Sequence, residues 1–142
     1  RKGYIAGNSL TDQEVATKVL EASKELIKIA VKFTIYLRDN VTVSDWNWET
    51  NDYSYSASGR GVVKNNTKYA IPDVKYVVTY TKRDGTEVTQ DEGSITYGEI
   101  RPYGMESFSF YTPYVGNASR ASIRLEFDKD FIFETVAKGE FE

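Results

Sequence analysis

The sequence contains neither cysteine nor histidine in its 142 residues. Without these residues the chain cannot form disulfides, cysteine or serine–histidine nucleophiles, or zinc sites built from His and Cys ligands. It also lacks a run of roughly 18 apolar residues, so no segment of this sequence is expected to cross a membrane as a helix. The missing residue types therefore exclude several classes of enzyme and metalloprotein.

Positive charge is also scarce. The formal net charge is -3 and the sequence pI is about 5.1, which argues against a nucleic-acid partner because phosphate backbones need a basic face. Residues 1–40 carry seven Lys or Arg against five Asp or Glu, whereas residues 41–142 carry eleven against sixteen. This change of sign, from +2 to -5, indicates two structural units.

Aromatic residues, by contrast, are abundant. They make up 14% of the chain, and 11 of them are Tyr. Tyrosine favours strands, and this composition is not typical of a disordered chain.

A helical pattern covers the first unit. Thr11 and Glu14 have the spacing of a capping box, which marks a helix N-terminus. Helical spacing then relates a series of apolar residues, namely Val15, Val19, Ala22, Leu26 and Ala30. We predict a helix over residues 11–38 after a flexible lead-in at residues 1–10.

Two features of this helix stay open. Its end lies near residue 31 or near residue 38, because Phe33, Ile35 and Leu37 also alternate like a strand. The helix either docks its apolar stripe on the following domain or forms a stalk that pairs with another copy. An exposed stripe of this width would promote association.

After residue 40 the hydrophobic period changes to two, and turns recur about every dozen residues. No helical segment separates the strands. We therefore predict an antiparallel immunoglobulin-like β-sandwich of six to seven strands over residues 41–136. A turn at residues 128–130 leads into a short final apolar segment, residues 131–133. Residues 137–142 are expected to be a tail that is partly of cloning origin.

Three segments of the sandwich region resemble a known family. They are GVVKNNT at residues 61–67, VKYVVTY at residues 74–80 followed by RDGT at residues 83–86, and IRPYGMESF at residues 100–108. They are similar to the FxLYD-type domains, which are bacterial extracytoplasmic immunoglobulin-like modules, over about residues 41–130. The resemblance implies a secreted or surface-anchored module without catalytic residues.

Two groups of aromatic residues are candidate binding residues. Four aromatic residues are concentrated within ten positions, namely Trp46, Trp48, Tyr53 and Tyr55. Flat rings bury much area at little entropic cost, so this group could form a ligand platform. The alternative is that at least one Trp packs between the sheets. Four further tyrosines lie near strand ends and turns and are candidates for protein contact, namely Tyr97, Tyr103, Tyr111 and Tyr114.

No catalytic residues, cofactor or metal site are predicted. The carboxylate pairs Asp91–Glu92 and Asp128–Asp130 lack the spacing of a calcium-binding loop, and solvated turn charges explain them. We expect the chain not to be an enzyme.

The sequence predicts a non-catalytic extracytoplasmic interaction or structural module of a bacterial surface or envelope protein, anchored through its parent protein in the periplasm or at the cell surface. The alternative is a carbohydrate-binding module that uses the first aromatic group. The expected partner is a protein or a glycan, and the helix could mediate homo-oligomer formation.

Overall fold

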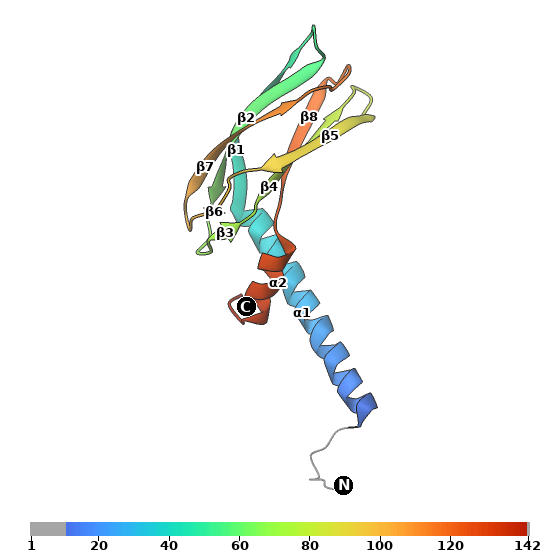
Figure 1. Ribbon diagram of the computed structural model, residues 1–142, viewed down its shortest axis with the longest axis vertical. Helices are drawn as coiled ribbons and strands as arrows, with labels where there is room; N and C mark the ends of the chain where they lie inside the picture. Colours follow the sequence, from blue (N-terminus) through green and yellow to red (C-terminus); the bar gives the residue numbers. More distant parts are fainter. Residues whose placement is uncertain (1–10, 142) are drawn as a thin grey trace.

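The computed structural model describes residues 11–141, so the predicted lead-in at residues 1–10 lies outside the described residues. A long helix, eight strands and a short helix follow one another along the chain (Figure 1). The elements are α1 (Asp12–Asn40), β1 (Val41–Asn51), β2 (Ser56–Asn65), β3 (Ile71–Pro72), β4 (Lys75–Thr81), β5 (Glu87–Ser94), β6 (Glu99–Ile100), β7 (Met105–Thr112), β8 (Arg120–Glu126) and α2 (Lys129–Ala137).

The strands form an antiparallel β-sandwich, as predicted. One sheet has the strand order β1-β2-β7 and the other β5-β4-β8. Strands β3 and β6 pair only with each other, through Ile71 and Ile100. These two-residue strands account for the difference between the eight observed strands and the six to seven predicted.

The core lies between the two sheets. Alternate residues of β4 and β7 point inward, because successive side chains of a strand face opposite sides. The ring of Tyr76 on β4 stacks on that of Phe108 on β7, with ring centroids 5.3 Å apart. Val63, Val78 and Ile100 are fully buried beside them. Contacts of this kind hold the sheets face to face.

Helix α1 begins as the sequence predicts and runs to the later of the two expected ends. The amide of Glu14 donates to Oγ1 of Thr11, and the amide of Thr11 donates to the Glu14 carboxylate. The helix continues to Asn40 and passes directly into β1. Residues 33–37 are helical because Phe33 and Leu37, four positions apart, share a buried face.

Residues 129–137 form helix α2 at the C-terminal end of the range predicted for the sandwich domain, where the sequence analysis expected no helix. The strands end at Glu126, and the segment at residues 131–133 is helical. Asp128 caps the helix by accepting a hydrogen bond from the amide of Phe131. Three consecutive apolar residues do not distinguish a short strand from a helical turn that is buried on one side.

Helix α1 is docked along one half and exposed along the other, and its pairing with another copy stays a prediction. Its C-terminal half packs against α2, and Phe33 contacts Phe131 with ring centroids 5.8 Å apart. All side chains of residues 11–28 are exposed, so this half projects from the sandwich as a stalk. Figure 1 shows it extending away from the strands.

Candidate interaction site

The most prominent candidate site lies at the end of the sandwich opposite α1. It is formed by the turn between β1 and β2, residues 52–55, and by the connection between β7 and β8, residues 113–119; we call these segments the distal loops. Figure 1 shows both at the far end of the molecule. The amide of Val115 donates to the carbonyl of Tyr55 at 2.7 Å, and the rings of Tyr55 and Tyr114 lie 6.2 Å apart. The two loops therefore form one surface.

The β1–β2 turn is ordered by its own hydrogen bonds. The side-chain oxygen of Asn51 accepts from the amides of Tyr53 and Ser54, and the carbonyl of Asn51 accepts from the amide of Tyr55. Tyr55 has a φ of 54°, in the left-handed region that bulky residues rarely occupy. The turn holds this strained backbone while Tyr53 stays 99% exposed. Such strain is common where a side chain is positioned for contact.

The structure divides the first predicted aromatic group. Trp46 and Trp48 are half-buried on β1 and pack against the core, where Trp46 contacts Phe110 and Trp48 contacts Tyr80. The alternative, in which at least one Trp packs between the sheets, therefore describes their position. Tyr53 and Tyr55 lie instead in the turn beyond the strand.

The second predicted group is also divided. Tyr114 belongs to a distal loop, and Tyr111 lies on the last residues of β7 close to it. Tyr103 lies in the turn between β6 and β7, where its amide donates to the carbonyl of Thr67, and Tyr97 lies in the connection between β5 and β6. The structure thus places two residues from each predicted group at the distal end, namely Tyr53, Tyr55, Tyr111 and Tyr114, and brings the rings of Tyr55 and Tyr114 into contact. We call these four residues the distal tyrosines.

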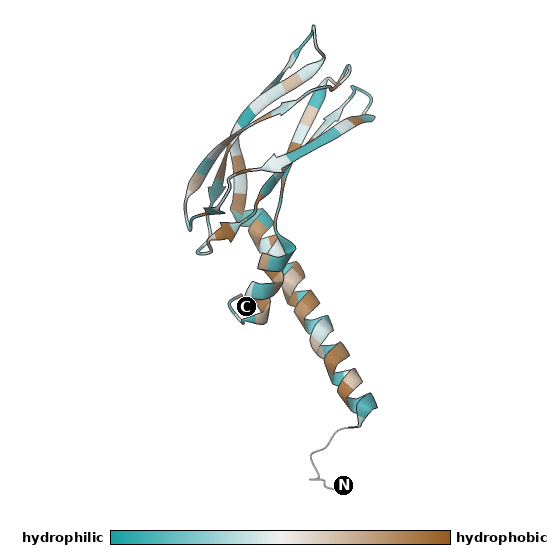
Figure 2. Cartoon of the chain, viewed as in Figure 1, coloured by the Kyte–Doolittle hydropathy of each residue, from teal (hydrophilic) through white to brown (hydrophobic). Residues whose placement is uncertain are grey.

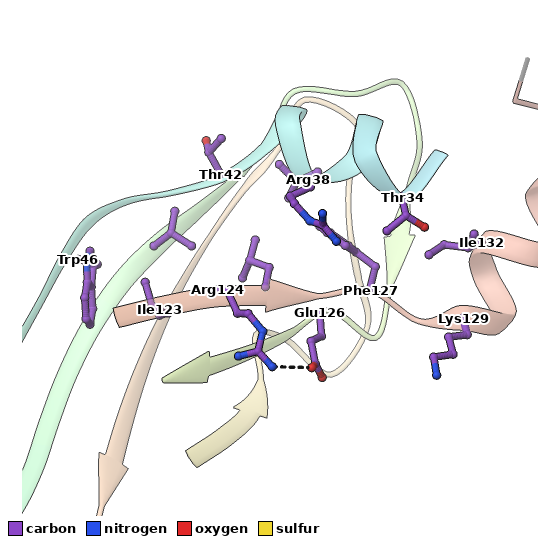
Figure 3. Close-up of a pocket in the computed structure, with 13 residues that line it drawn as sticks. Thr34, Arg38, Thr42, Trp46, Ile123, Arg124, Glu126, Phe127, Lys129 and Ile132 are labelled. Carbon is purple, nitrogen blue, oxygen red and sulfur yellow. Dashed lines mark hydrogen bonds and ion pairs between the residues drawn. The ribbon is translucent and has the colours of Figure 1, made fainter. Parts of the chain in front are cut away.

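A second candidate site, which the sequence did not predict, is a groove between β1 and β8. Each of these strands is an edge strand of its sheet, and the groove has a volume of about 930 Å³. Its lining includes Val43, Trp46 and Leu125. On its rim Arg124 pairs with Glu126 at 3.1 Å (Figure 3). The alternating pattern of β8 predicted a strand, but only the sheet order shows that this strand lies at an edge.

Two of the four carboxylates weighed as metal ligands, Asp91 and Asp128, have structural roles. Asp91 accepts a hydrogen bond from the hydroxyl of Thr112 at 2.7 Å, and Asp128 caps α2. Among residues 11–141 no group of three or more acidic side chains is placed to hold a metal ion.

The stalk half of α1 carries a third exposed surface. Its apolar residues, coloured brown in Figure 2, include Val15, Val19, Leu20, Leu26 and Ile27, which are 37% to 59% exposed. Within the described part of the chain, no helix combines the length and hydropathy needed to span a membrane.

No protein-family model matches the chain, and no curated protein matches it in sequence. Several solved structures align with part of the chain at low sequence identity and low TM-score. A DUF1425 family member from Shewanella sp. pv-4 is 13% identical, covers 62% of this chain and 78% of its own, and has a TM-score of 0.43. A Campylobacter jejuni protein, Cj0090, is 12% identical over 61% of this chain and 85% of its own, with a TM-score of 0.42. The trimeric lipoprotein SadB of Salmonella enterica is 9% identical over 82% of this chain and 80% of its own, with a TM-score of 0.40. The FxLYD-type resemblance stays a prediction.

Proposed function

We propose that this chain is a non-catalytic interaction module of a bacterial envelope protein, and that its distal loops contact a partner protein. The observation that carries the proposal is the position of the distal tyrosines at the end of the sandwich farthest from the stalk. In this arrangement the sandwich separates the contact surface from α1, which begins at Asp12.

The composition of the distal loops supports a protein partner. Residues 51–56 read NDYSYS and residues 112–119 read TPYVGNAS. Tyr, Ser, Asn and Gly are the residues that antibody loops use, because Tyr supplies a large rigid surface while the small polar residues adapt their hydrogen bonds. Asp52 is the one charged residue in these two segments. Low charge is typical of the centre of an interface.

Photocrosslinking in cells of the source organism tests this proposal. A photoreactive benzoylphenylalanine replaces Tyr114 in one variant and Tyr103 in a matched control. These residues are 64% and 67% exposed, but only Tyr114 lies in a distal loop. We expect a protein adduct from position 114 and none from position 103. Equal adducts from both positions, or none from position 114, would contradict the proposal.

Carbohydrate binding is the second candidate, because the exposed rings of Tyr53 and of the Tyr55–Tyr114 pair offer flat faces for a sugar. A glycan array probed with the chain and with Tyr53→Ala distinguishes this candidate. Binding that falls at least tenfold in the variant would support it. No binding, or binding that the substitution leaves unchanged, would remove it.

We propose an extracytoplasmic location for the module, on the basis of the FxLYD-type segments. Because the chain has no cysteine, an Arg83→Cys variant in the exposed β4–β5 turn gives a single thiol for labelling. A membrane-impermeant maleimide should label it on intact cells or after the outer membrane is permeabilised. Labelling only after complete lysis would contradict this location.

The proposed module also works as a homo-oligomer that forms through α1. The apolar residues of the stalk are exposed within the described part of the chain, and this supports the proposal, since an exposed patch of this kind favours association.

A further inference from the structure

We infer that residues 12–28 of α1 pack into a parallel bundle of three or more copies of this chain. The inference rests on the proposed homo-oligomer and specifies its surface, orientation and minimum number of copies. It follows from the width of the exposed apolar face, from its alignment with an interface inside the chain, and from the charges around it.

The stalk presents two adjacent apolar seams. The first follows the spacing 4-3-4 through Val15, Val19, Ala22 and Leu26. The second follows the same spacing one residue later, through Ala16, Leu20, Ser23 and Ile27. One residue corresponds to a rotation of about 100°, so the seams together cover an apolar face far wider than one helix can bury.

The width of this apolar face sets the minimum number of copies in the bundle. In a two-stranded coiled coil each helix buries one narrow seam against one partner. Pairing along the first seam would leave Leu20 and Ile27, both more than half exposed in the chain, still in water. A closed ring of three or more copies gives each helix two neighbours, one on each seam. When the first seam of one helix contacts the second seam of the next, the contact is heterologous and closes into a ring of cyclic symmetry, so the helices are parallel and all the sandwiches lie at the same end.

The first seam continues an interface that the chain already makes. An α-helix repeats its facing after 18 residues, or five turns, so Val15 and Val19 lie on the same side of α1 as Phe33 and Leu37. Phe33 and Leu37 are fully buried, and Phe33 packs against the rings of Phe131 and Phe141. This face is therefore a helix-packing surface, and α2 and the residues after it cover its C-terminal half. Its N-terminal half has no cover among the described residues, and α1 of another copy provides a matching helix.

The charges of the stalk favour another copy over an anionic membrane. Residues 12–28 contain four acidic residues and three lysines, so their net charge is -1. The acidic residues and lysines alternate along the polar face as Glu14, Lys18, Glu21, Lys24, Glu25 and Lys28. Copies with nearly balanced charges repel one another only weakly, whereas each of these lysines has an acidic neighbour that weakens attraction to anionic lipid.

The mass of the full chain in solution, measured by sedimentation equilibrium over a range of concentrations, tests the inference. The chain mass is 16.1 kDa, and we expect a species of at least three times this mass at high concentration. Val19→Glu places a charge in the first seam and Ile27→Glu places one in the second. Both variants should sediment as monomers. Thr17→Glu adds the same charge on the polar side of the helix and should leave the mass unchanged.

A monomeric or dimeric native chain would overturn the inference, and so would an Ile27→Glu variant that keeps the native mass. All three substituted positions are exposed, so the sandwich should fold in each variant, and an unchanged near-ultraviolet circular dichroism spectrum, which reports on its packed aromatic rings, checks this. The Val19→Glu variant also separates this inference from the distal-loop proposal. If it is monomeric and still gives the adduct from position 114, both stand; if the native chain gives no such adduct but forms the bundle, only the distal-loop proposal fails.

Discussion

Asn65 shows how one buried side chain organises a turn. Its side-chain nitrogen donates to the carbonyls of Tyr69, Ile100 and Arg101, and its oxygen accepts from the amide and hydroxyl of Thr67. The end of β2 is thereby tied to the connections around β3 and β6. This network gives a structural reason for the NNT segment at residues 65–67.

Asn65→Ala should lower the free energy of unfolding by about 3 kcal/mol, because it leaves several buried polar groups without partners. Asn66→Ala is the matched control. Asn66 is exposed, and this substitution should change stability by less than about 0.5 kcal/mol. Urea unfolding of the three proteins measures the difference. Equal stability of the two variants would show that the network around Asn65 does not hold the turn.

Tyr80 links the two sheets. Its hydroxyl lies 2.8 Å from that of Thr112, which donates in turn to Asp91. Burial raises the pKa of Tyr80 above the ordinary value of 10.0, and burial likewise raises the pKa of Tyr69 and Tyr76. The folded chain therefore keeps these phenols neutral at a pH where the unfolded chain ionises them.

The free energy of unfolding should be insensitive to these tyrosines below pH 10 and should fall as the pH rises above it, because the unfolded state then loses protons first. Tyr80→Phe should cost about 1 kcal/mol at neutral pH, through the lost hydrogen bond, and should make the alkaline loss less steep. Thermal unfolding of both proteins from neutral to alkaline pH measures this. If the free energy of unfolding of Tyr80→Phe fell with rising pH as steeply as that of the native chain, the Tyr80 phenol would not cause the loss of stability.

At the scale of the elements, α2 holds the upper half of α1 in place. Phe131 faces α1 and packs against Phe33, whereas Phe133, two residues later, is exposed. Phe131→Ala should therefore lower the stability by about 2 kcal/mol and increase amide exchange in residues 29–37. Phe133→Ala should do neither. Hydrogen exchange measured by mass spectrometry checks both, and equal protection in the two variants would show that α2 does not secure the helix.

The sequence predicts a helix or strand best where its apolar residues follow a single hydrophobic period. Strands β4 and β8 alternate clearly, and α1 has both a capping box and a long apolar stripe, so these elements were predictable. Helix α2 has only nine residues, and its apolar core of three consecutive residues carries no period. What makes it helical is the Asp128 cap together with packing on α1, and packing of this kind is not visible in a local pattern.

At the scale of the whole molecule, the candidate site depends on contacts that are far apart in the sequence. The first aromatic group was identified from its concentration within ten positions and the second from its positions near strand ends and turns, but neither pattern predicts how the structure regroups them. Tyr55 and Tyr114, 59 positions apart, meet because β2 pairs with β7 with Ala57 opposite Thr112, which places the β1–β2 turn beside the β7–β8 connection. The groove between β1 and β8 likewise requires the sheet order, which no local pattern contains.

The molecule separates two kinds of surface by its full length. The wide apolar face of the stalk lies at one end and the distal tyrosines lie at the other (Figures 1 and 2). A parallel bundle would place several copies of the distal loops side by side. Linked binding surfaces raise the effective concentration for each further contact, so even weak individual contacts would give stable attachment.

The photocrosslinking yield at position 114, in chains that keep or lack the neighbouring tyrosines, tests most directly whether the distal tyrosines contact a partner protein. We predict a protein adduct in the native background and its loss when Tyr53 and Tyr55 are both replaced by Ser, with no adduct from position 103 in either background. The exposed position of these two tyrosines means that the fold should tolerate the double substitution. An adduct from position 114 that persists in the double variant would contradict the claim that the distal tyrosines form the binding surface.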